Sequence, residues 1–524
     1  MLRPPIFWSD YKYMLKISAI LLLIILLAGC GARGLDYSGY PTGSGEGNGD
    51  FASGSVENGD DDELEPETPP PDIPPYNEYR ISLEVDPYER TVQGISRVTF
   101  TNRSDIPLET VVFRVFLNAF QEGYYPPPFF PEHKRRIFRG NEAFGSMEIL
   151  YAFSDNEALE YELDGTVLTL FLVDAIKPEE TVELLLQFSA NVPLIAHRTG
   201  GNDRALWFGM FLPILAVHDE NGWHTGAYYA AGHPFVLETA NYRVDITTPS
   251  RYIVVGTGLR TDEVIVEDTD TKITHFSAQQ ARDFSFAISP YFQHAHVATE
   301  SGVDIHFYFY SEMTRLEEIM HLASHSVEYF EYRVGRYPLG NITIVETDMM
   351  VDSVAFSQMV FVDTRVLNHS SLWALGHGIG RQWFSNVVGT NRITEPWLDE
   401  GLTRFVQAGI FYPTPEDFRN RMTRDYYSIS DLTNLYISDG LWAYDNWGDF
   451  ARAQGRKAML MIYALNERMG DEVFWNFLNR YYQQFSFRMA TGYDFMRLAE
   501  EAHGNSLEDF FDKWINGGTV PPLP

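Results

Sequence analysis

The chain has 524 residues and a formal net charge of −33, from 39 Lys and Arg against 72 Asp and Glu. This length accommodates two or three domains of ordinary size, and a hydrophobic content of 45% indicates sizeable cores. The negative charge argues against nucleic-acid binding, because the chain offers no basic surface to neutralise phosphates. It also argues against docking on an anionic bilayer through a charged face, and it chiefly favours solubility.

Cys30 is the only cysteine in the sequence, so an internal disulfide is excluded. Arg3, Lys12 and Lys16 precede an apolar run over residues 17–27, which is followed by Leu-Ala-Gly-Cys. A charged start, an apolar core and small residues are typical of a signal peptide. As a helix this run would span only about 16 Å, against about 30 Å for a hydrocarbon core. The alternative is a short, uncleaved anchor helix.

The Leu-Ala-Gly-Cys ending resembles a bacterial lipobox. The resemblance implies that residues 1–29 are a lipoprotein signal peptide and that Cys30 becomes a lipid-modified N-terminus. We therefore expect an exported protein, anchored by lipid to the outer face of a bacterial cytoplasmic membrane or to the cell envelope. Residues 30–75 are predicted to be a disordered acidic linker, because their Gly, Ser and Pro content cannot bury enough apolar surface to offset ordering entropy.

Residues 76–300 are predicted to form an N-terminal β domain. The run from Ile81 to Val85 alternates apolar and polar residues, as do residues 98–101 and 167–171, and this period is typical of half-buried strands. Several short strands at this spacing favour a β-sandwich-like fold. The residues expected at turns are Gly94, Asn102 and Gly165.

Residues 301–524 are predicted to form a second, mostly helical domain. Apolar residues recur at helical spacing from Leu316 to Phe330, and a short apolar strand follows at residues 342–345. Further helices are expected at residues 371–388, 400–412, 449–469 and 471–484, with Pro413 and Gly470 as stop signals.

Two segments of this second domain carry polar groups at a distinctive spacing. Residues 376–386 read GHGIGRQWFSN, and residues 397–401 read WLDEG. They resemble the H-E-x-x-H-Q-W-F-x-N and W-L-x-E-G motifs of the membrane alanine aminopeptidase family of zinc metallopeptidases. Eighteen residues lie between Arg381, at the second His position, and Glu400, as the family pattern requires.

The resemblance covers nearly all of residues 79–518. It implies a multidomain α and β protein, in which the N-terminal β-sandwich-like domain is followed by a thermolysin-like α/β, mostly helical, peptidase domain. The segments that support it outside the motif are residues 79–102, 207–258, 470–474 and 509–514.

The zinc motif itself is incomplete. In H-E-x-x-H the two His share one helix face and bind one zinc, while the Glu acts as general base. Here the first ligand position is His377, the base position is Gly378 and the second ligand position is Arg381. A guanidinium is permanently charged and has no lone pair for a metal. The third ligand position, Glu400, is conserved in type, so His377 and Glu400 are the residual metal ligands.

Two further family positions are also replaced. A gapless count back from Gly470 places Gly455 where the family has the Tyr that stabilises the oxyanion. Ala355 falls at the Glu that holds the free amine of the substrate, and Asp352 nearby could substitute for it. None of the family's catalytic groups is therefore expected to be intact.

Two local questions stay open at this point. Arg381 could take the electrostatic place of the metal by pairing with Glu400, or it could turn to solvent and leave Glu400 hydrated. Gly376, Gly378 and Gly380 each cost a helix about 1 kcal/mol relative to Ala. They either loosen this helix or permit close packing.

These observations predict an inactive homologue of a zinc aminopeptidase. We expect a lipid-anchored surface protein whose cleft binds peptides or protein termini, with no cofactor, no nucleic-acid partner and a membrane contact through its lipid. A purely structural envelope protein is a further reading that the sequence does not separate from this one.

The alternative is an active zinc metallopeptidase, aminopeptidase-like, that uses substitute residues. Zinc would then be its cofactor. The substitute groups considered are Asp399, Glu395, His369 and Tyr444. A separate metal cluster of His218, His224 and His233 is also considered, against their reading as surface or packing residues.

Overall fold

The computed structural model describes residues 76–139, 143–369 and 371–524. The predicted signal peptide, the predicted lipid-attachment residue Cys30 and the predicted acidic linker lie outside these residues. Within the described ranges, no helix combines the length and the apolar character needed to cross a membrane.

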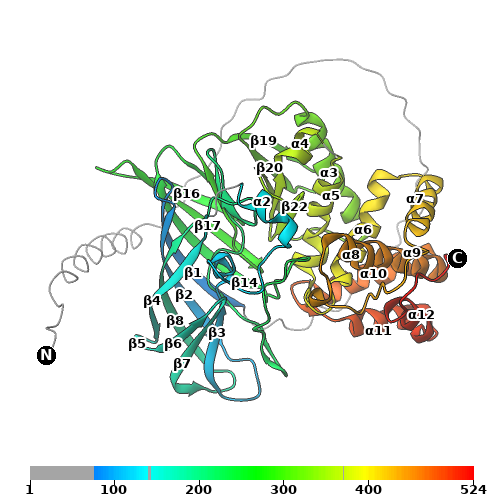
Figure 1. Cartoon of the computed structure of the whole chain (residues 1–524), viewed down its shortest axis with the longest axis horizontal. Coiled ribbons are helices and arrows are strands. Elements are labelled where there is room, and N and C mark those ends of the chain that lie inside the picture. The colour runs from blue at the N-terminus through cyan, green and yellow to red at the C-terminus, as the bar shows by residue number, and fades with distance from the viewer. Residues whose placement is uncertain (1–75, 140–142, 370) are drawn as a thin grey trace. The chain divides into compact units, whose positions relative to one another are not determined.

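A large mixed sheet forms the framework of the N-terminal β domain (Figure 1). Its central strand pairs in parallel with one neighbour and antiparallel with the other, and inward-facing residues alternate with outward-facing ones along it, as a half-buried strand requires. In sheet order the strands are β16 (Leu259–Val266), β17 (Thr271–Ala281), β14 (Ala240–Pro249), β1 (Asn77–Asp86), β2 (Thr91–Thr101), β8 (Thr181–Asn191), β4 (Ser146–Ser154) and β5 (Glu157–Ala158).

Smaller sheets share a hydrophobic core with this framework. The first contains β15 (Ile253–Gly256), β18 (Phe286–Ser289), β10 (Leu206–Phe208) and β9 (Thr199–Gly201). The second contains β11 (Ile214–Leu215), β3 (Leu108–Arg114), β7 (Val167–Ile176) and β6 (Glu160–Asp164), and a short pair joins β12 (His218–Asp219) to β13 (Gly222–Trp223). The predicted β domain is thus confirmed.

One predicted turn is wrong. Gly94 lies in the middle of β2 rather than between strands. A Cβ at this position would lie 2.1 Å from the Cζ atom of Phe188 on the neighbouring strand, so glycine is needed because an aromatic ring occupies the space above it. Gly165, in contrast, does form a turn between β6 and β7, with φ of 54°.

The second domain contains a five-stranded sheet and a set of helices, the first of which lies between two of the strands in chain order. The sheet order is β19 (Gln293–Ala298), β20 (Asp304–Phe309), β21 (Asn341–Thr347), β23 (Met359–Asp363) and β22 (Ser353–Phe356). The helices are α3 (Leu316–Arg333), α4 (Thr364–His369), α5 (Trp373–Gly380), α6 (Trp397–Phe411), α7 (Pro415–Tyr427), α8 (Trp447–Phe450), α9 (Ala458–Met469), α10 (Asp471–Phe485), α11 (Gly492–His503) and α12 (Glu508–Ile515).

The predicted helices are present, but two of them are interrupted. The stretch expected at residues 371–388 is α5 followed by a π-helical turn over Gln382–Val387, inside which Phe384 leaves helical geometry. The stretch expected at residues 449–469 contains a π-helical segment over Ala451–Lys457 before α9. Both distortions occur at the motif positions identified from the sequence, as is frequent for π segments at functional sites.

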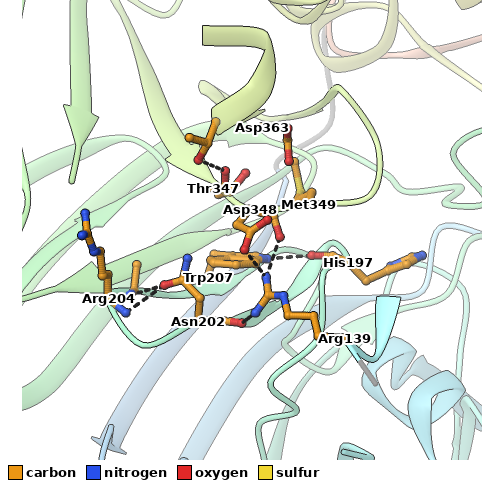
Figure 2. Close-up of polar contacts among 12 residues, drawn as sticks. Arg139, His197, Asn202, Arg204, Trp207, Thr347, Asp348, Met349 and Asp363 are labelled. Atoms are coloured by element: carbon orange, nitrogen blue, oxygen red, sulfur yellow. Dashed lines mark hydrogen bonds and ion pairs between the residues drawn. The ribbon is translucent and has the colours of Figure 1, made fainter. Parts of the chain in front are cut away.

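Polar contacts join the β-rich part of the chain to the second domain (Figure 2). The Arg139 guanidinium donates to the backbone oxygens of Gly201 and Asp348, and it lies 2.7 Å from the Asp348 carboxylate. Figure 2 shows this guanidinium between the loop of Asn202 and the end of β21. Arg139 and Asp348 are both partly exposed, so this ion pair contributes less than a buried one.

A fully buried arginine makes a stronger connection. The Arg282 guanidinium donates to the backbone oxygens of Leu237, Asn386, Val387 and Arg488, at 2.8–3.1 Å. Burial lowers the pKa of Arg282 to about 9. The charge is therefore stabilised largely by carbonyl dipoles, two of which belong to the end of the π-helical turn after α5.

We predict that Arg282→Ala lowers the free energy of unfolding by at least about 3 kcal/mol, because it leaves several buried carbonyl oxygens without donors. Urea denaturation followed by tryptophan fluorescence measures this. Arg80→Ala is the matched control, because the Arg80 side chain is 58% exposed and its loss should change stability by less than about 0.5 kcal/mol. Equal effects of the two substitutions would contradict the prediction.

Candidate functional site

Helices α5 and α6 bring the motif residues together. His377 lies in the last turn of α5, and Arg381 caps that helix four residues later, so the two side chains share one face. Asp399 and Glu400 lie in the first turn of α6. The apolar faces of both helices are buried in the core of the second domain, which fixes their separation.

Arg381 bridges the two carboxylates of α6. Its Nη1 atom lies 2.5 Å from Oε1 of Glu400, and its Nη2 atom lies 2.5 Å from Oδ2 of Asp399. Side-chain exposure is 3% for Arg381, 1% for Asp399 and 7% for Glu400. The sequence left open whether Arg381 pairs with Glu400 or turns to solvent; in the structure the two are paired, and Asp399 is an additional partner.

A second arginine, Arg404, also contacts Glu400, and the sequence did not predict this contact. The Nε atom of Arg404 lies 3.2 Å from Oε2 of Glu400, four residues earlier on α6. A Cβ added to Gly455 would lie 2.7 Å from the same Nε atom. Arg404 therefore lies against the backbone where the family has its tyrosine. The i, i+4 spacing of Glu400 and Arg404 in the sequence could have indicated this ion pair.

His377 is oriented by a glutamine. The Gln407 amide donates to the backbone oxygen of Trp373 at 2.5 Å, which leaves its Oε1 atom to accept from Nδ1 of His377 at 3.2 Å. The Nε2 atom of His377 then faces Glu400 at 3.5 Å. This arrangement keeps the lone pair of Nε2 directed into the site, as a metal-ligating histidine requires.

The glycines of α5 permit close packing. A Cβ at Gly378 would lie 2.5 Å from Cγ1 of Val360 on β23, and a Cβ at Gly380 would lie 2.3 Å from the ring of Phe330 on α3. Gly376 is less tightly enclosed, with its nearest neighbours at 3.3 Å. Val360 therefore occupies the space that a side chain at residue 378 would need. The resemblance assigns the general base to this residue.

The amine-anchor position is also apolar. Ala355 is buried within β22, where it pairs with Val360 of β23. The Asp352 side chain is 70% exposed and lies 3.9 Å from Arg365. Asp352 therefore points to solvent rather than replacing the missing carboxylate.

Most of the other candidate groups are engaged elsewhere. Glu395 accepts two hydrogen bonds from the backbone nitrogen of Gly492 at the start of α11. The Tyr444 hydroxyl accepts from the amide of Gln454 at 2.6 Å. His369 is exposed at the end of α4. Only Asp399, among the substitutes considered, contacts the site, and it does so through Arg381.

The three histidines of the β domain do not form a cluster. His218 packs against the ring of Trp223, and His224 lies 2.7 Å from Asp219. Burial lowers the pKa of His233, and nearby Arg381 lowers it further. Across residues 76–139, 143–369 and 371–524, no three His, Cys, Asp or Glu side chains are arranged to hold a metal ion.

The electrostatics of the site follow from burial and from its two arginines. Burial raises the pKa of Asp399 to about 6, which outweighs the attraction of Arg381. Burial also acts to raise the pKa of Glu400, but the guanidinium groups of Arg381 and Arg404 hold it well below its usual range. Burial lowers the pKa of His377 despite the nearby Glu400. Glu400 is therefore ionised and His377 neutral at neutral pH.

These side chains do not suit a bound zinc ion. His377 and Glu400 supply two donors, whereas structural and catalytic zinc sites use at least three protein ligands. Both oxygens of Glu400 already accept from guanidinium groups, and Arg381 and Arg404 would repel a divalent cation. The donor set resembles an ion-pair network more than a coordination shell.

Comparisons with known proteins show which family and which structures this chain resembles. Residues 338–514 match the Peptidase family M1 domain. The match covers less than half of the 524-residue chain. In structure it is similar to the M1 zinc metallopeptidase of Deinococcus radiodurans, with a TM-score of 0.65 and 16% identity over 86% of this chain and 95% of that one. A variant of that enzyme bound to a Tyr-Ser-Ala substrate gives a TM-score of 0.64 at 17% identity, over 86% of this chain and 96% of the variant. This likeness shows the two-domain fold.

Curated relatives match a shorter part of the chain. Probable aminopeptidase 1 of Sulfurisphaera tokodaii is 23% identical over 213 residues, which are 38% of this chain and 25% of that protein. Aminopeptidase O of Homo sapiens is 21% identical over 243 residues, 38% of this chain and 28% of that protein. The chain therefore matches only about a quarter of the length of either relative.

We predict that Glu400→Gln destabilises the protein by about 3–5 kcal/mol near pH 7, because it breaks a buried ion pair. The folded protein lowers the pKa of Glu400, so its contribution to stability is present above the ordinary glutamate value of 4.5 and is lost as the pH falls below it. The difference in urea midpoint between wild type and variant should therefore shrink below about pH 4.5. Glu472→Gln, at an exposed position of α10, is the control. A difference that grows on acidification would refute this assignment.

Proposed function

We propose that this chain is a catalytically inactive homologue of the zinc aminopeptidases, acting as a lipid-anchored surface protein that binds peptides or protein termini. The observation that carries the proposal is the Arg381 guanidinium, which contacts both Asp399 and Glu400 where the family has its second histidine ligand. The M1 match over residues 338–514 contains all three residues, so the replacement occurs within a retained domain.

The magnitude of the missing catalytic contributions supports inactivity. Gly378 supplies no general base, whose loss commonly costs about 10²–10⁴-fold in rate. Gly455 supplies no oxyanion donor, whose loss commonly costs a further 10²–10³-fold. With an arginine at a metal-ligand position as well, the combined deficit leaves little rate acceleration over the uncatalysed reaction.

The local packing supports the same proposal independently of the charges. Val360 lies where a side chain at residue 378 would have to pass, and Arg404 lies where one at residue 455 would begin. A side chain at residue 378 would therefore conflict with Val360, whereas one at residue 455 would require the flexible Arg404 side chain to move. The neighbouring side chains have adapted to the replacements.

The alternative is an active metallopeptidase, aminopeptidase-like, that uses substitute residues. The orientation of His377 favours it, because Gln407 holds the Nε2 atom toward Glu400 at 3.5 Å. Two ligand atoms of one metal lie at a similar separation. Against this reading, Asp399 is the one substitute group that reaches the site, and it is paired with Arg381.

We predict that the purified full chain contains well below one zinc per molecule and does not cleave aminoacyl-anilide substrates. Elemental analysis and a peptidase assay on the same preparation measure both quantities. Binding of a Tyr-Ser-Ala peptide, followed by calorimetry, tests the proposed retention of peptide binding. One zinc per chain together with hydrolysis would establish the alternative instead.

A rebuilt site provides the positive control for that assay. Arg381→His restores the second imidazole, Gly378→Glu restores the base, and Val360→Ala removes the atom that lies 2.5 Å from a Cβ at residue 378. The triple variant should bind zinc more tightly than wild type. Gly378→Glu with Val360→Ala, which keeps Arg381, should not.

We also predict that Cys30→Ala moves the protein from the membrane fraction to the soluble fraction of the expressing bacterium. The lipobox-like sequence before Cys30 motivates this expectation, and loss of the thiol removes the lipid attachment point. Fractionation with immunodetection measures the change. A variant that remains in the membrane would favour an uncleaved anchor helix over residues 17–27.

A further inference from the structure

A hairpin outside the α5–α6 site carries three histidines. It is formed by β19 and β20, both labelled in Figure 1, and β19 is the edge strand of its sheet. His294 and His296 lie two residues apart on β19, so both point to one face of the sheet. His306 lies directly opposite His296 in the register. Ile305 and Phe307 carry the other face of β20 into the core, so the histidines lie on the face away from that core.

Two of these imidazoles face each other through ring nitrogens. Nε2 of His294 lies 3.0 Å from Nδ1 of His306, and the ring centroids are 5.2 Å apart. A hydrogen bond at this distance needs the N–H of one ring to point at the lone pair of the other, so the two nitrogens converge. Within the described ranges, neither ring hydrogen-bonds to any further group. The two nitrogens are thus placed as neighbouring ligands of one ion.

The distance between the two nitrogens selects the metal geometry that they fit. With metal–nitrogen bonds of about 2.0–2.1 Å, nitrogens 3.0 Å apart subtend an angle of about 90–100° at the ion. Neighbouring ligands of a square-planar or tetragonal ion make such an angle, and Cu²⁺ and Ni²⁺ adopt these geometries with nitrogen ligands. A tetrahedral Zn²⁺ ion would need about 3.3–3.4 Å between the nitrogens. The pair therefore fits Cu²⁺ better than Zn²⁺.

Neighbouring side chains restrict both rings of the pair. Tyr308, opposite His294 in the register, stacks on its ring with centroids 4.6 Å apart. His296 is engaged elsewhere, because its Nε2 atom lies 2.8 Å from Oδ1 of Asp304. Burial lowers the pKa of both His294 and His306, so both imidazoles are neutral near pH 7. A neutral imidazole is the form that binds a metal.

The charges near the pair oppose each other. Asp304 acts to raise the pKa of His306 and would attract a cation, whereas Arg260 acts to lower it and would repel one. The Arg260 side chain is 53% exposed and lies 3.7 Å from Glu263, so solvent and this carboxylate screen its charge. In the His377–Glu400 region, in contrast, two buried or partly buried arginines contact the carboxylate itself. The hairpin is therefore the better place for a cation.

We propose that His294 and His306 bind one Cu²⁺ ion on the surface of the β19–β20 hairpin, with water in the remaining coordination positions. The ion replaces the hydrogen between the two nitrogens. That hydrogen moves through solvent to the other nitrogen of its own ring, so both imidazoles stay neutral. Two protein ligands make a labile surface site, which is compatible with the lack of three-ligand groups among the described residues. The site is independent of the His377–Glu400 region and of whether that region has activity.

The test titrates CuCl₂ into the full chain, purified without a histidine tag and kept in a buffer that does not bind copper. Calorimetry measures the stoichiometry and affinity, and electron paramagnetic resonance at substoichiometric copper reports how many nitrogens are bound. We expect the tightest Cu²⁺ site to hold one ion per chain with two nitrogen ligands. Ni²⁺ and Zn²⁺ should each bind more weakly than Cu²⁺.

Variants locate the site. His294→Gln and His306→Gln should each weaken Cu²⁺ binding at least about tenfold, because loss of even an indirect partner of a metal ligand costs about 10–100-fold. His321→Gln is the matched control, since it alters another exposed histidine pair, His321 and His325 of α3, whose ring centroids lie 6.1 Å apart. It should leave Cu²⁺ binding unchanged. Thermal denaturation of each variant checks that it is folded.

Three results would overturn the proposal. The first is absence of Cu²⁺ binding by the wild-type chain. The second is tight Cu²⁺ binding that survives both His294→Gln and His306→Gln. The third is loss of the tight site in His321→Gln, which would place the ion on α3 instead.

Discussion

The buried contact of Arg381 with Asp399 and Glu400 is the constraint around which the α5–α6 region is organised. Two carboxylates placed in the first turn of one helix need a cation, because an isolated buried charge is costly. Arg381 supplies it from the end of the preceding helix, and Arg404 supplies a second on Glu400. The four formal charges cancel, so the domain can enclose this network.

Two glycines near this network also have a packing role. Glycine at residue 455 leaves room for Arg404, and Arg404 in turn helps to hold Glu400 in its ionised form. Glycine at residue 378 lets β23 approach α5 through Val360. Each replacement makes room for a neighbour. The neighbours of Gly378 and Gly455 fit closely around them, and well-packed interiors resist voids.

The surrounding fold is less sensitive to these changes. A TM-score of 0.65 at 16% identity means that the two-domain architecture persists while most side chains differ. Arg282 illustrates how the framework is maintained, since its guanidinium joins carbonyls from both domains close to the π-helical turn after α5. One fold can carry many different sites. Here the ion pairs of Arg381 hold the site together, whereas the hydrogen bonds of Arg282 help to hold the framework.

The sequence by itself determined the strands around β1, the helices α3, α6 and α10, and the positions of His377, Arg381 and Glu400, because hydrophobic period and residue spacing are local properties. It also showed which side chains lack the chemistry for metal binding. It misplaced Gly94, and it did not reveal Arg404 beside Gly455 or the pairing of Asp399 with Arg381. Those features depend on which atoms lie across a strand or helix boundary. Only tertiary packing decides that, because a neighbour distant in sequence leaves no periodic signal.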